Sequence, residues 1–338
     1  MMGYQAMKLK KLLGVLILFL LFSVSAVFVS ATNAQPPFNF PGRNPRSFDF
    51  ALIGDIPYDA RQEIEFQKLI KDINKSLVSF VIHDGDFKSG SSLCSDELFY
   101  QRYREFNEFR HPLIYIFGDN EWTDCHRPAA GGFDSIERLA KLREIFTKSD
   151  RSLGRKTIKL NRQSDELAYS KFRENVYWTK NDILFAGIHV VGSNNNLGRN
   201  AANDLEYAER NAANLAWLKK AFATAKAKNY LGMVVIIHAN PNNFSVPANA
   251  QQNGFSDFIN TLKAELKEYS KPVMIVNGDT HYFRIDKPLN IDTPPNTVVT
   301  NFTRVETFGD PNVQWLRVTV DPKNPHLFEV NKEILPVE

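Results

Sequence analysis

Residues 114–124 read I-Y-I-F-G-D-N-E-W-T-D, an apolar run that stops at a Gly-Asp pair and is followed by an amide, a second acid and a tryptophan. Three more apolar runs end in the same dipeptide, at Gly54-Asp55, Gly85-Asp86 and Gly278-Asp279. Short runs of β-branched and aromatic residues that stop at a turn signal are typical of buried strands. We therefore interpret each Gly-Asp pair as the carboxyl end of a strand.

Segments with helical spacing separate the first three of these strands. Residues 61–74 place apolar side chains on one face of a helix, and further helices are predicted at 95–109 and from Asp134 to Phe146. Strands that alternate with helices are typical of a parallel α/β sheet. Because right-handed crossovers bring the carboxyl ends of such strands to one edge, the Gly-Asp pairs should converge there.

The second half of the chain adds two polar strand ends. A predicted strand at 233–237 ends at His238, and another at 272–276 leads into N-G-D-T-H at 277–281. A hairpin at 176–191 and a long helix at 202–228 are also predicted, and the last third alternates apolar and polar residues as half-buried antiparallel strands do. With no internal repeat or linker, we predict that residues 47–338 form one domain.

The N-terminus has the form of a secretory signal. In residues 1–34, three lysines precede an apolar run that starts at Leu12, and small residues follow it. The apolar run is close to the shortest membrane span, so an uncleaved anchor is the alternative. Residues 35–46 are a Pro-rich lead-in. We expect an exported protein, secreted or periplasmic, that meets a membrane only if this N-terminal segment is retained.

Charge and cysteine content narrow the function classes. Residues 1–34 hold three of the 41 basic residues and none of the 38 acidic ones, which leaves 38 of each in the rest. This balance gives no indication of nucleic-acid binding, and nothing in the sequence indicates an oligomeric state. Cys94 and Cys125 each follow a Gly-Asp pair, so in an exported protein they are candidates for a disulfide, with two buried thiols as the alternative.

The predicted strand ends carry a set of metal-ligand residue types: Asp55, Asp86, Asp119 with Asn120, His238, Asp279 and His281. One aspartate at a strand end is usually a cap or turn residue. Several carboxylates at one edge need a compensating charge, which divalent metals bound by Asp, Asn and His would supply. Two metals that share a carboxylate can activate water and bind a phosphoryl group. No G-x-S-x-G, Walker A or G-x-G-x-x-G motif competes with this interpretation.

The order of these motifs resembles that of the calcineurin-like metallophosphoesterase superfamily, in the neighbourhood of the purple acid phosphatases. That pattern runs D-x-H, G-D, G-N-H-[DE], a single His after a strand, and G-H-x-H. The corresponding segments are Asp55-Ile56-Pro57, Gly85-Asp86, Gly118-Asp119-Asn120-Glu121, His238 and Gly278-Asp279-Thr280-His281. The resemblance covers about residues 50–285. It implies a two-sheet α/β sandwich with flanking helices and a dinuclear metal site at the C-terminal ends of the strands.

The resemblance also implies roles for single residues. Asp86 would bridge the two metals, and Asp55 and His281 would hold one of them. The other would be held by His238, Asp279 and either Asp119 or Asn120. His83 is a candidate hydrogen-bond partner of Asp86, with a packed strand-end histidine as the alternative. Asp279 stands where the pattern G-H-x-H has its first histidine, so a carboxylate oxygen replaces a histidine nitrogen. The site should therefore prefer Mn²⁺ or Mg²⁺ to Zn²⁺ or iron.

Two departures from the pattern affect the chemistry. Pro57 stands where the family has a metal-binding histidine, and Tyr58 is the nearest replacement. In G-D-N-E two registers are open. Either Asp119 is the ligand and Asn120 takes the place of the catalytic histidine, or Asn120 is the ligand and Glu121 takes that place. A Glu121 with a raised pKa would then protonate the leaving group.

These residues together indicate a phosphoesterase. We expect a metal-dependent hydrolase that acts on a small phosphate mono- or diester through metal-activated water. The alternative is a catalytically degenerate protein of the same fold that binds a ligand or a partner.

Overall fold

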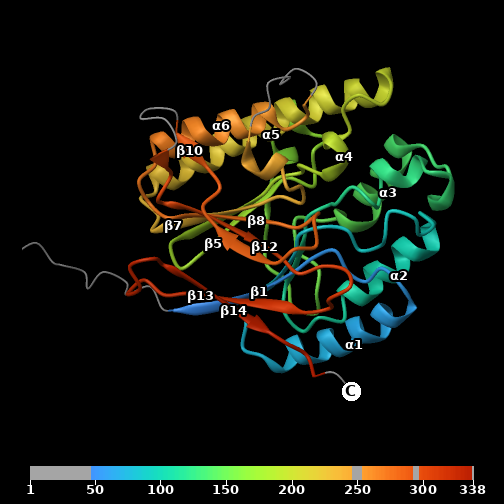
Figure 1. Ribbon diagram of the computed structural model, residues 1–338, viewed down its shortest axis with the longest axis horizontal. Helices are drawn as coiled ribbons and strands as arrows, with labels where there is room; N and C mark the ends of the chain where they lie inside the picture. Colours follow the sequence, from blue (N-terminus) through green and yellow to red (C-terminus); the bar gives the residue numbers. More distant parts are fainter. Residues whose placement is uncertain (1–46, 246–252, 292–296, 337–338) are drawn as a thin grey trace, which may run out of the picture. The chain divides into compact units, whose positions relative to one another are not determined.

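The computed structural model describes residues 47–245, 253–291 and 297–336. The predicted signal segment (1–34) and lead-in (35–46) therefore lie outside the described residues. Within the described residues, two β-sheets pack face to face and helices cover their outer faces (Figure 1). This is the two-sheet α/β sandwich expected from the sequence. None of the helices formed by the described residues is long and apolar enough to cross a membrane.

The first sheet combines the N-terminal strands with the C-terminal ones, in the order β14-β13-β1-β2-β3. Its strands β1, β2 and β3 are parallel, whereas β13 pairs antiparallel with both β1 and β14. The strands are β1 (Phe48–Ile53), β2 (Val81–His83), β3 (Leu113–Tyr115), β13 (Trp315–Val320) and β14 (Phe328–Glu333). The helices that pack on its outer face are α1 (Ala60–Lys75), α2 (Asp96–Phe106) and α3 (Ser135–Phe146).

The second sheet has the order β4-β5-β6-β7-β8-β12-β9. Its central strands β6, β7, β8 and β12 are parallel. The strands are β4 (Asn161–Arg162), β5 (Val176–Lys180), β6 (Ile183–Gly187), β7 (Gly232–Ile236), β8 (Val273–Asn277), β12 (Phe302–Glu306) and β9 (Arg284–Asp286). The helices α5 (Ala201–Ala227) and α6 (Ser256–Lys267) lie together across its outer face (Figure 1).

Shorter elements complete the described chain. β10 (Asn290–Ile291) pairs with β11 (Thr297–Val298), and α4 (Gly192–Asn195) follows β6. The 3₁₀ helices are η1 (Thr123–His126), η2 (Pro128–Ala130), η3 (Gln163–Asp165), η4 (Leu167–Tyr169) and η5 (Asn242–Phe244).

Strand β1 shows why the parallel strands are continuous apolar runs in the sequence. Phe50 and Leu52 point into the layer between the two sheets, whereas Ala51 and Ile53 pack against the helices. A strand with a protein layer on each face needs apolar residues at every position. Polar residues are therefore excluded from the strands themselves and can lie at the carboxyl ends of the parallel strands of both sheets.

Candidate metal centre

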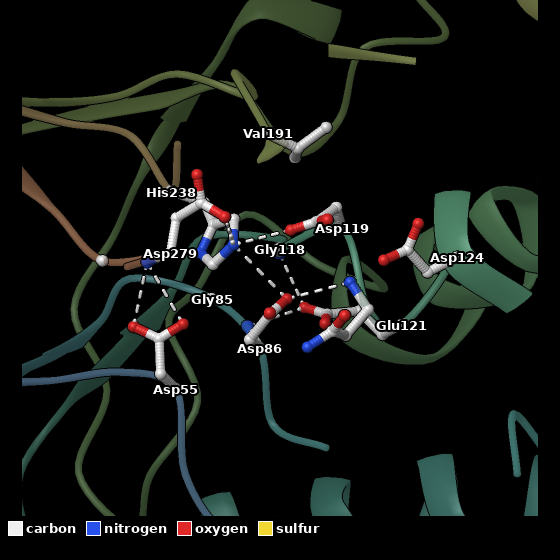
Figure 2. A network of polar contacts seen from close by, with 12 residues as sticks. Asp55, Gly85, Asp86, Gly118, Asp119, Glu121, Asp124, Val191, His238 and Asp279 are labelled. Carbon is white, nitrogen blue, oxygen red and sulfur yellow. Dashed lines mark hydrogen bonds and ion pairs between the residues drawn. The ribbon is translucent and has the colours of Figure 1, made fainter. Parts of the chain in front are cut away.

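The polar strand ends converge as the sequence predicted. Asp55, Asp86 and Asp119 follow β1, β2 and β3 in the first sheet, and His238 and Asp279 follow β7 and β8 in the second. Figure 2 shows these side chains directed toward one another. Nε2 of His238 lies 2.8 Å from Oδ1 of Asp119, 3.4 Å from Oδ1 of Asp86 and 3.9 Å from Oδ1 of Asp279. One imidazole thus joins carboxylates from both sheets.

The glycine of each Gly-Asp pair is explained by this convergence. A Cβ on Gly118 would lie 2.1 Å from Oδ1 of Asp86, and a Cβ on Gly85 would lie 2.4 Å from Nδ1 of His238. Both distances are far below van der Waals contact. The dipeptide therefore marks strand ends that are too close together for any side chain except the ligand itself.

Four of the predicted ligands have a left-handed backbone. The φ angles are 54° at Asp55, 55° at Asp86, 76° at Asp279 and 57° at His281. For a residue other than glycine this conformation costs about 1–3 kcal/mol, and it persists mainly where function requires it. Strain at four positions of one cluster indicates that the chain is arranged to direct these side chains inward.

The ligand atoms form two overlapping groups. The oxygen and nitrogen atoms of Asp55, Asp86 and His238 lie within 4.8 Å of one another, and so do those of Asp119, His238 and Asp279. His281 belongs to neither group, although its Nε2 is 3.6 Å from Oδ1 of Asp55. The second group contains three of the residues predicted to hold one ion, whereas the first contains Asp55 and the predicted bridge Asp86 but has His238 where the resemblance implied His281.

The electrostatics of the cluster favour a bound cation. Asp55, Asp86 and His238 have almost no solvent exposure. Burial, and then repulsion among the carboxylates, raises the pKa values of Asp55 and Asp86 well above their usual range. Burial alone would lower the pKa of His238, but Asp86 and Asp119 raise it well above its usual range. Carboxylate oxygens with imidazole nitrogen are a donor set that fits divalent metal ions.

The tautomer of His238 is set by a residue that the sequence analysis did not select. Nδ1 of His238 lies 3.1 Å from the carbonyl oxygen of Asp84, which leaves Nε2 facing the carboxylates. Asp84 is itself buried and accepts a hydrogen bond of 2.9 Å from Oγ1 of Thr307. A backbone partner on the second nitrogen is usual for metal-binding histidines and fixes the ring.

The structure favours one of the two registers of G-D-N-E. Oδ1 of Asp119 lies 2.8 Å from Nε2 of His238, inside the ligand cluster, as expected if Asp119 is the ligand. Asn120 donates from its backbone N–H to Oδ1 of Asp86 at 2.9 Å and from Nδ2 to Oη of Tyr58 at 3.1 Å. Asn120 therefore faces the site from the position next to the predicted ligand.

Glu121 does not take the place predicted for a general acid. Its side chain is fully buried, and Oε1 accepts hydrogen bonds from the backbone N–H groups of Gly118 at 2.6 Å and Asp86 at 3.2 Å, and from the hydroxyl of Tyr115. These contacts turn the carboxylate toward the backbone that it supports. The structure thus favours a positioning role for Glu121 over proton transfer to a leaving group.

His83 likewise supports the backbone rather than the Asp86 carboxylate. Nδ1 of His83 accepts a hydrogen bond of 3.2 Å from the N–H of Gly85, and Nε2 lies 3.2 Å from the carbonyl oxygen of Ile56. The residue is fully buried, and burial lowers its pKa to about 3, so its neutral form is favoured. It is the packed strand-end histidine that was the alternative interpretation.

Comparison with known proteins agrees with this geometry. The family model described as calcineurin-like phosphoesterase matches residues 48–283, which is most of the described chain. The chain belongs to the calcineurin-like phosphoesterase family. No match was found among the curated proteins.

Three solved structures also match parts of this chain at low sequence identity. A dimetal phosphatase from Danio rerio is 10% identical, with a TM-score of 0.49 over 80% of this chain and 95% of that chain. A 5'-nucleotidase from Candida albicans is 10% identical, with a TM-score of 0.43 over 84% of this chain and 51% of that chain. Vacuolar protein sorting 29 from Cryptosporidium parvum is 11% identical, with a TM-score of 0.32 over 85% and 97% of the two chains.

In this member of the calcineurin-like phosphoesterase family, a disulfide supports the turn that carries Asp119. Cys94 and Cys125 are bonded, as the sequence suggested, and each sulfur lies 3.6 Å from the carbonyl oxygen of Asn120. Nζ of Lys88 donates to the same carbonyl at 2.8 Å. The turn that presents Asp119 is thereby tied to the segment that follows β2.

A second support was missed by the sequence analysis. Oγ of Ser193 lies 2.8 Å from Oδ2 of Asp119 and 2.7 Å from Oδ1 of Asp124, and the half-exposed Arg127 pairs with Asp124 at 2.6 Å. Residues 193–196 all have positive φ angles. The run S-N-N-N was the available signal, because asparagine tolerates the left-handed conformation better than most residues.

Proposed function

We propose that this protein is an exported metal-dependent phosphoesterase that hydrolyses a small phosphate mono- or diester. One observation carries the proposal, namely the convergence of four aspartates and His238 from both sheets into two overlapping ligand groups. Membership of the calcineurin-like phosphoesterase family supports the reaction class. The form of residues 1–34 and the Cys94–Cys125 disulfide support export, since disulfides persist mainly in oxidising compartments.

We assign two candidate positions for divalent ions. Asp55 and His281 would hold one, Asp119, His238 and Asp279 would hold the other, and Asp86 would be shared between them. Such ions supply Lewis acidity and a water nucleophile at neutral pH. The excess of carboxylate over imidazole supports Mn²⁺ or Mg²⁺ as the physiological metals.

Asn120 limits which esters are good substrates. Its Nδ2 group can donate a hydrogen bond to a phosphate oxygen at the position where the family pattern has a catalytic histidine. An amide does not transfer a proton at neutral pH, so the leaving group departs without help from this residue. We therefore propose that the preferred substrates have leaving groups that are stable as anions.

A non-catalytic function is the second candidate. Pro57 and Asn120 replace two histidines of the family pattern, and Glu121 is turned toward the backbone. These replacements favour a protein that keeps the fold and binds a phosphate-containing ligand without turnover.

Metal analysis and turnover separate the two candidates. The full chain is purified, its bound metal is measured, and hydrolysis of p-nitrophenyl phosphate and bis(p-nitrophenyl) phosphate is followed with Mn²⁺, Mg²⁺, Zn²⁺ or no metal. We expect Asp86→Asn to reduce turnover by more than about 100-fold, since even loss of an outer partner costs roughly 10–100-fold. Metal-dependent binding of these esters without turnover would establish the binding function instead.

Asp59 offers a matched control for Asp86→Asn. Asp59 is exposed and caps α1 through a hydrogen bond of 2.8 Å to the N–H of Gln62. Asparagine is an equally good cap, so Asp59→Asn makes the same chemical change without affecting the metal centre. Equal losses in Asp86→Asn and Asp59→Asn would refute the site assignment.

A further inference from the structure

One half of the metal centre lacks a donor that the family pattern provides. Pro57 stands in the place of the histidine that would join Asp55 and His281. The hydroxyl of Tyr58 occupies this region of the site. Its Oη atom lies 3.0 Å from Oδ2 of Asp86, 3.2 Å from Nε2 of His281 and 3.5 Å from Oδ1 of Asp55.

These distances are those expected between neighbouring ligands of one ion. Metal–oxygen distances of about 2.1 Å in octahedral geometry place adjacent ligand atoms roughly 3.0 Å apart. Oη of Tyr58 has this spacing, or slightly more, from one atom of each of three predicted ligands. The hydroxyl thus stands where a further ligand of the same ion would stand.

The hydroxyl of Tyr58 has more acceptor atoms around it than its one proton can serve, although the backbone N–H of Asp279 also donates to Oδ1 of Asp55, at 3.2 Å. Oη accepts a hydrogen bond from Nδ2 of Asn120 at 3.1 Å and has a single proton to donate. Carboxylate oxygens of both Asp55 and Asp86 lie within 3.5 Å of it, so one of them stays without that proton. A cation shared by these oxygens would satisfy all of them at once.

The position of the Tyr58 ring is fixed by its neighbours. Its backbone N–H donates to Oε1 of Gln62 at 2.8 Å, directly before α1 begins. The ring packs edge-on against His281, with centroids 5.2 Å apart and an interplanar angle of 76°. A side chain held at both ends in this way loses little further entropy on binding an ion.

We propose that Tyr58 replaces the missing histidine and that its hydroxyl oxygen is a ligand of the ion held by Asp55, Asp86 and His281. This inference rests on the proposed metal-dependent function and assigns a residue outside the family pattern to it. Oxygen in place of nitrogen makes this half of the centre harder, which favours Mn²⁺ and Mg²⁺ over Zn²⁺.

Metal titration of the full chain tests the assignment without relying on activity. The metal-free protein is titrated with Mn²⁺ in a calorimeter, and the wild type should bind two ions. Tyr58→Phe should weaken one of the two sites by about tenfold or more and leave the other unchanged. Tyr58→His should restore binding and raise the affinity for Zn²⁺ relative to Mn²⁺.

Two further measurements exclude indirect effects. Tyr282 is 66% exposed and directly follows His281 in the chain, so Tyr282→Phe serves as the matched control and should bind both ions as the wild type does. Thermal unfolding of the metal-free Tyr58→Phe protein should match the wild type, which shows that the affinity loss is not a folding defect.

The outcomes separate this inference from the proposed function. Two wild-type Mn²⁺ sites that persist unchanged in Tyr58→Phe would overturn the role of Tyr58 and leave the phosphoesterase proposal standing. A wild-type protein that binds no Mn²⁺, Mg²⁺ or Zn²⁺ would overturn both.

Discussion

Reduction of the Cys94–Cys125 disulfide should destabilise the protein by a predictable amount. The bond joins residues 31 positions apart. In the chain-entropy model, a loop of about 31 residues removes roughly 12 cal/mol/K from the unfolded ensemble, which is about 3.7 kcal/mol at 25 °C. A typical domain has a total stability of only about 5–15 kcal/mol, so the change should be large and easily measured.

The same bond should also affect the metal centre. Both sulfurs contact the carbonyl oxygen of Asn120, and Asp119 directly precedes that residue. When the bond is broken, the turn loses its covalent link to the segment after β2 and keeps only non-covalent ones, from Lys88, whose Nζ lies 2.8 Å from the same carbonyl, and from Asp86. We therefore expect reduced protein to bind Mn²⁺ more weakly as well as to unfold more easily.

Equilibrium unfolding in guanidinium chloride measures the effect. Oxidised and reduced wild-type protein have the same side chains, so their difference isolates the covalent link from any cavity. Cys94→Ala/Cys125→Ala should lose at least as much, because it also empties the buried space of two sulfurs. If oxidised and reduced wild-type protein differ by less than about 1 kcal/mol, the chain-entropy reasoning is wrong for this loop.

Three further predictions follow from single residues. Gly118→Ala should abolish tight Mn²⁺ binding and cost about 1–3 kcal/mol, because its Cβ would lie 2.1 Å from Oδ1 of Asp86. In Gly132→Ala the new Cβ meets nothing within 4 Å. The φ angle of 66° makes alanine strained there, but this variant should keep the metals, and calorimetry compares Mn²⁺ binding by the two variants. Burial lowers the pKa of His189 to about 4, despite its hydrogen bond to Glu174. Between about pH 6.5 and pH 4 the unfolded protein therefore binds one more proton than the folded protein, and up to about 3 kcal/mol of stability is lost as the pH falls through this window. His189→Gln should remove this part of the pH dependence in urea unfolding, and parallel curves for the two proteins would contradict the assignment. Asn120→His should raise turnover of esters with poor leaving groups by about 100-fold and leave p-nitrophenyl esters little changed. If steady-state assays show equal effects on esters with poor and with good leaving groups, the absence of a proton donor at position 120 does not limit turnover.

The sequence predicted the edge at which the site forms but not its detailed contacts. The apolar run before Asp119 and the helical spacing of residues 61–74 are local patterns, and local patterns place strands and helices. The apolar run before Gly85-Asp86 predicts a strand from Leu77, but β2 starts at Val81, and Leu77 is 89% exposed and lies before the sheet begins. An apolar residue on the surface is common, so periodicity alone does not reveal it.

The choice between Asp119 and Asn120 depended on information that a linear pattern does not contain. Which of two adjacent side chains enters the cluster is decided by the backbone angles of the turn and by what fixes that turn in space. Here Glu121 fixes it, by accepting hydrogen bonds from the N–H groups of Gly118 and Asp86. From the sequence alone, the same glutamate is a candidate catalytic acid. A carboxyl group can either transfer a proton or position the backbone, and only its hydrogen-bond partners distinguish these two roles.

The Gly-Asp pairs have a physical reason that accounts both for their repetition and for the limits of the motif. The aspartate is the ligand, and the glycine is present because the strand ends lie too close together for a second side chain. Such a pattern marks the positions where strand ends from the two sheets meet. It does not predict residues that reach the candidate metal centre from outside the strand ends. Tyr58 arrives from the turn before α1 and Ser193 from the left-handed run after β6, and both contact the predicted ligands. On the proposed function, the motif positions therefore define where the ions would lie, whereas the identity of the ions and the choice of ester would depend on residues that the motif does not include.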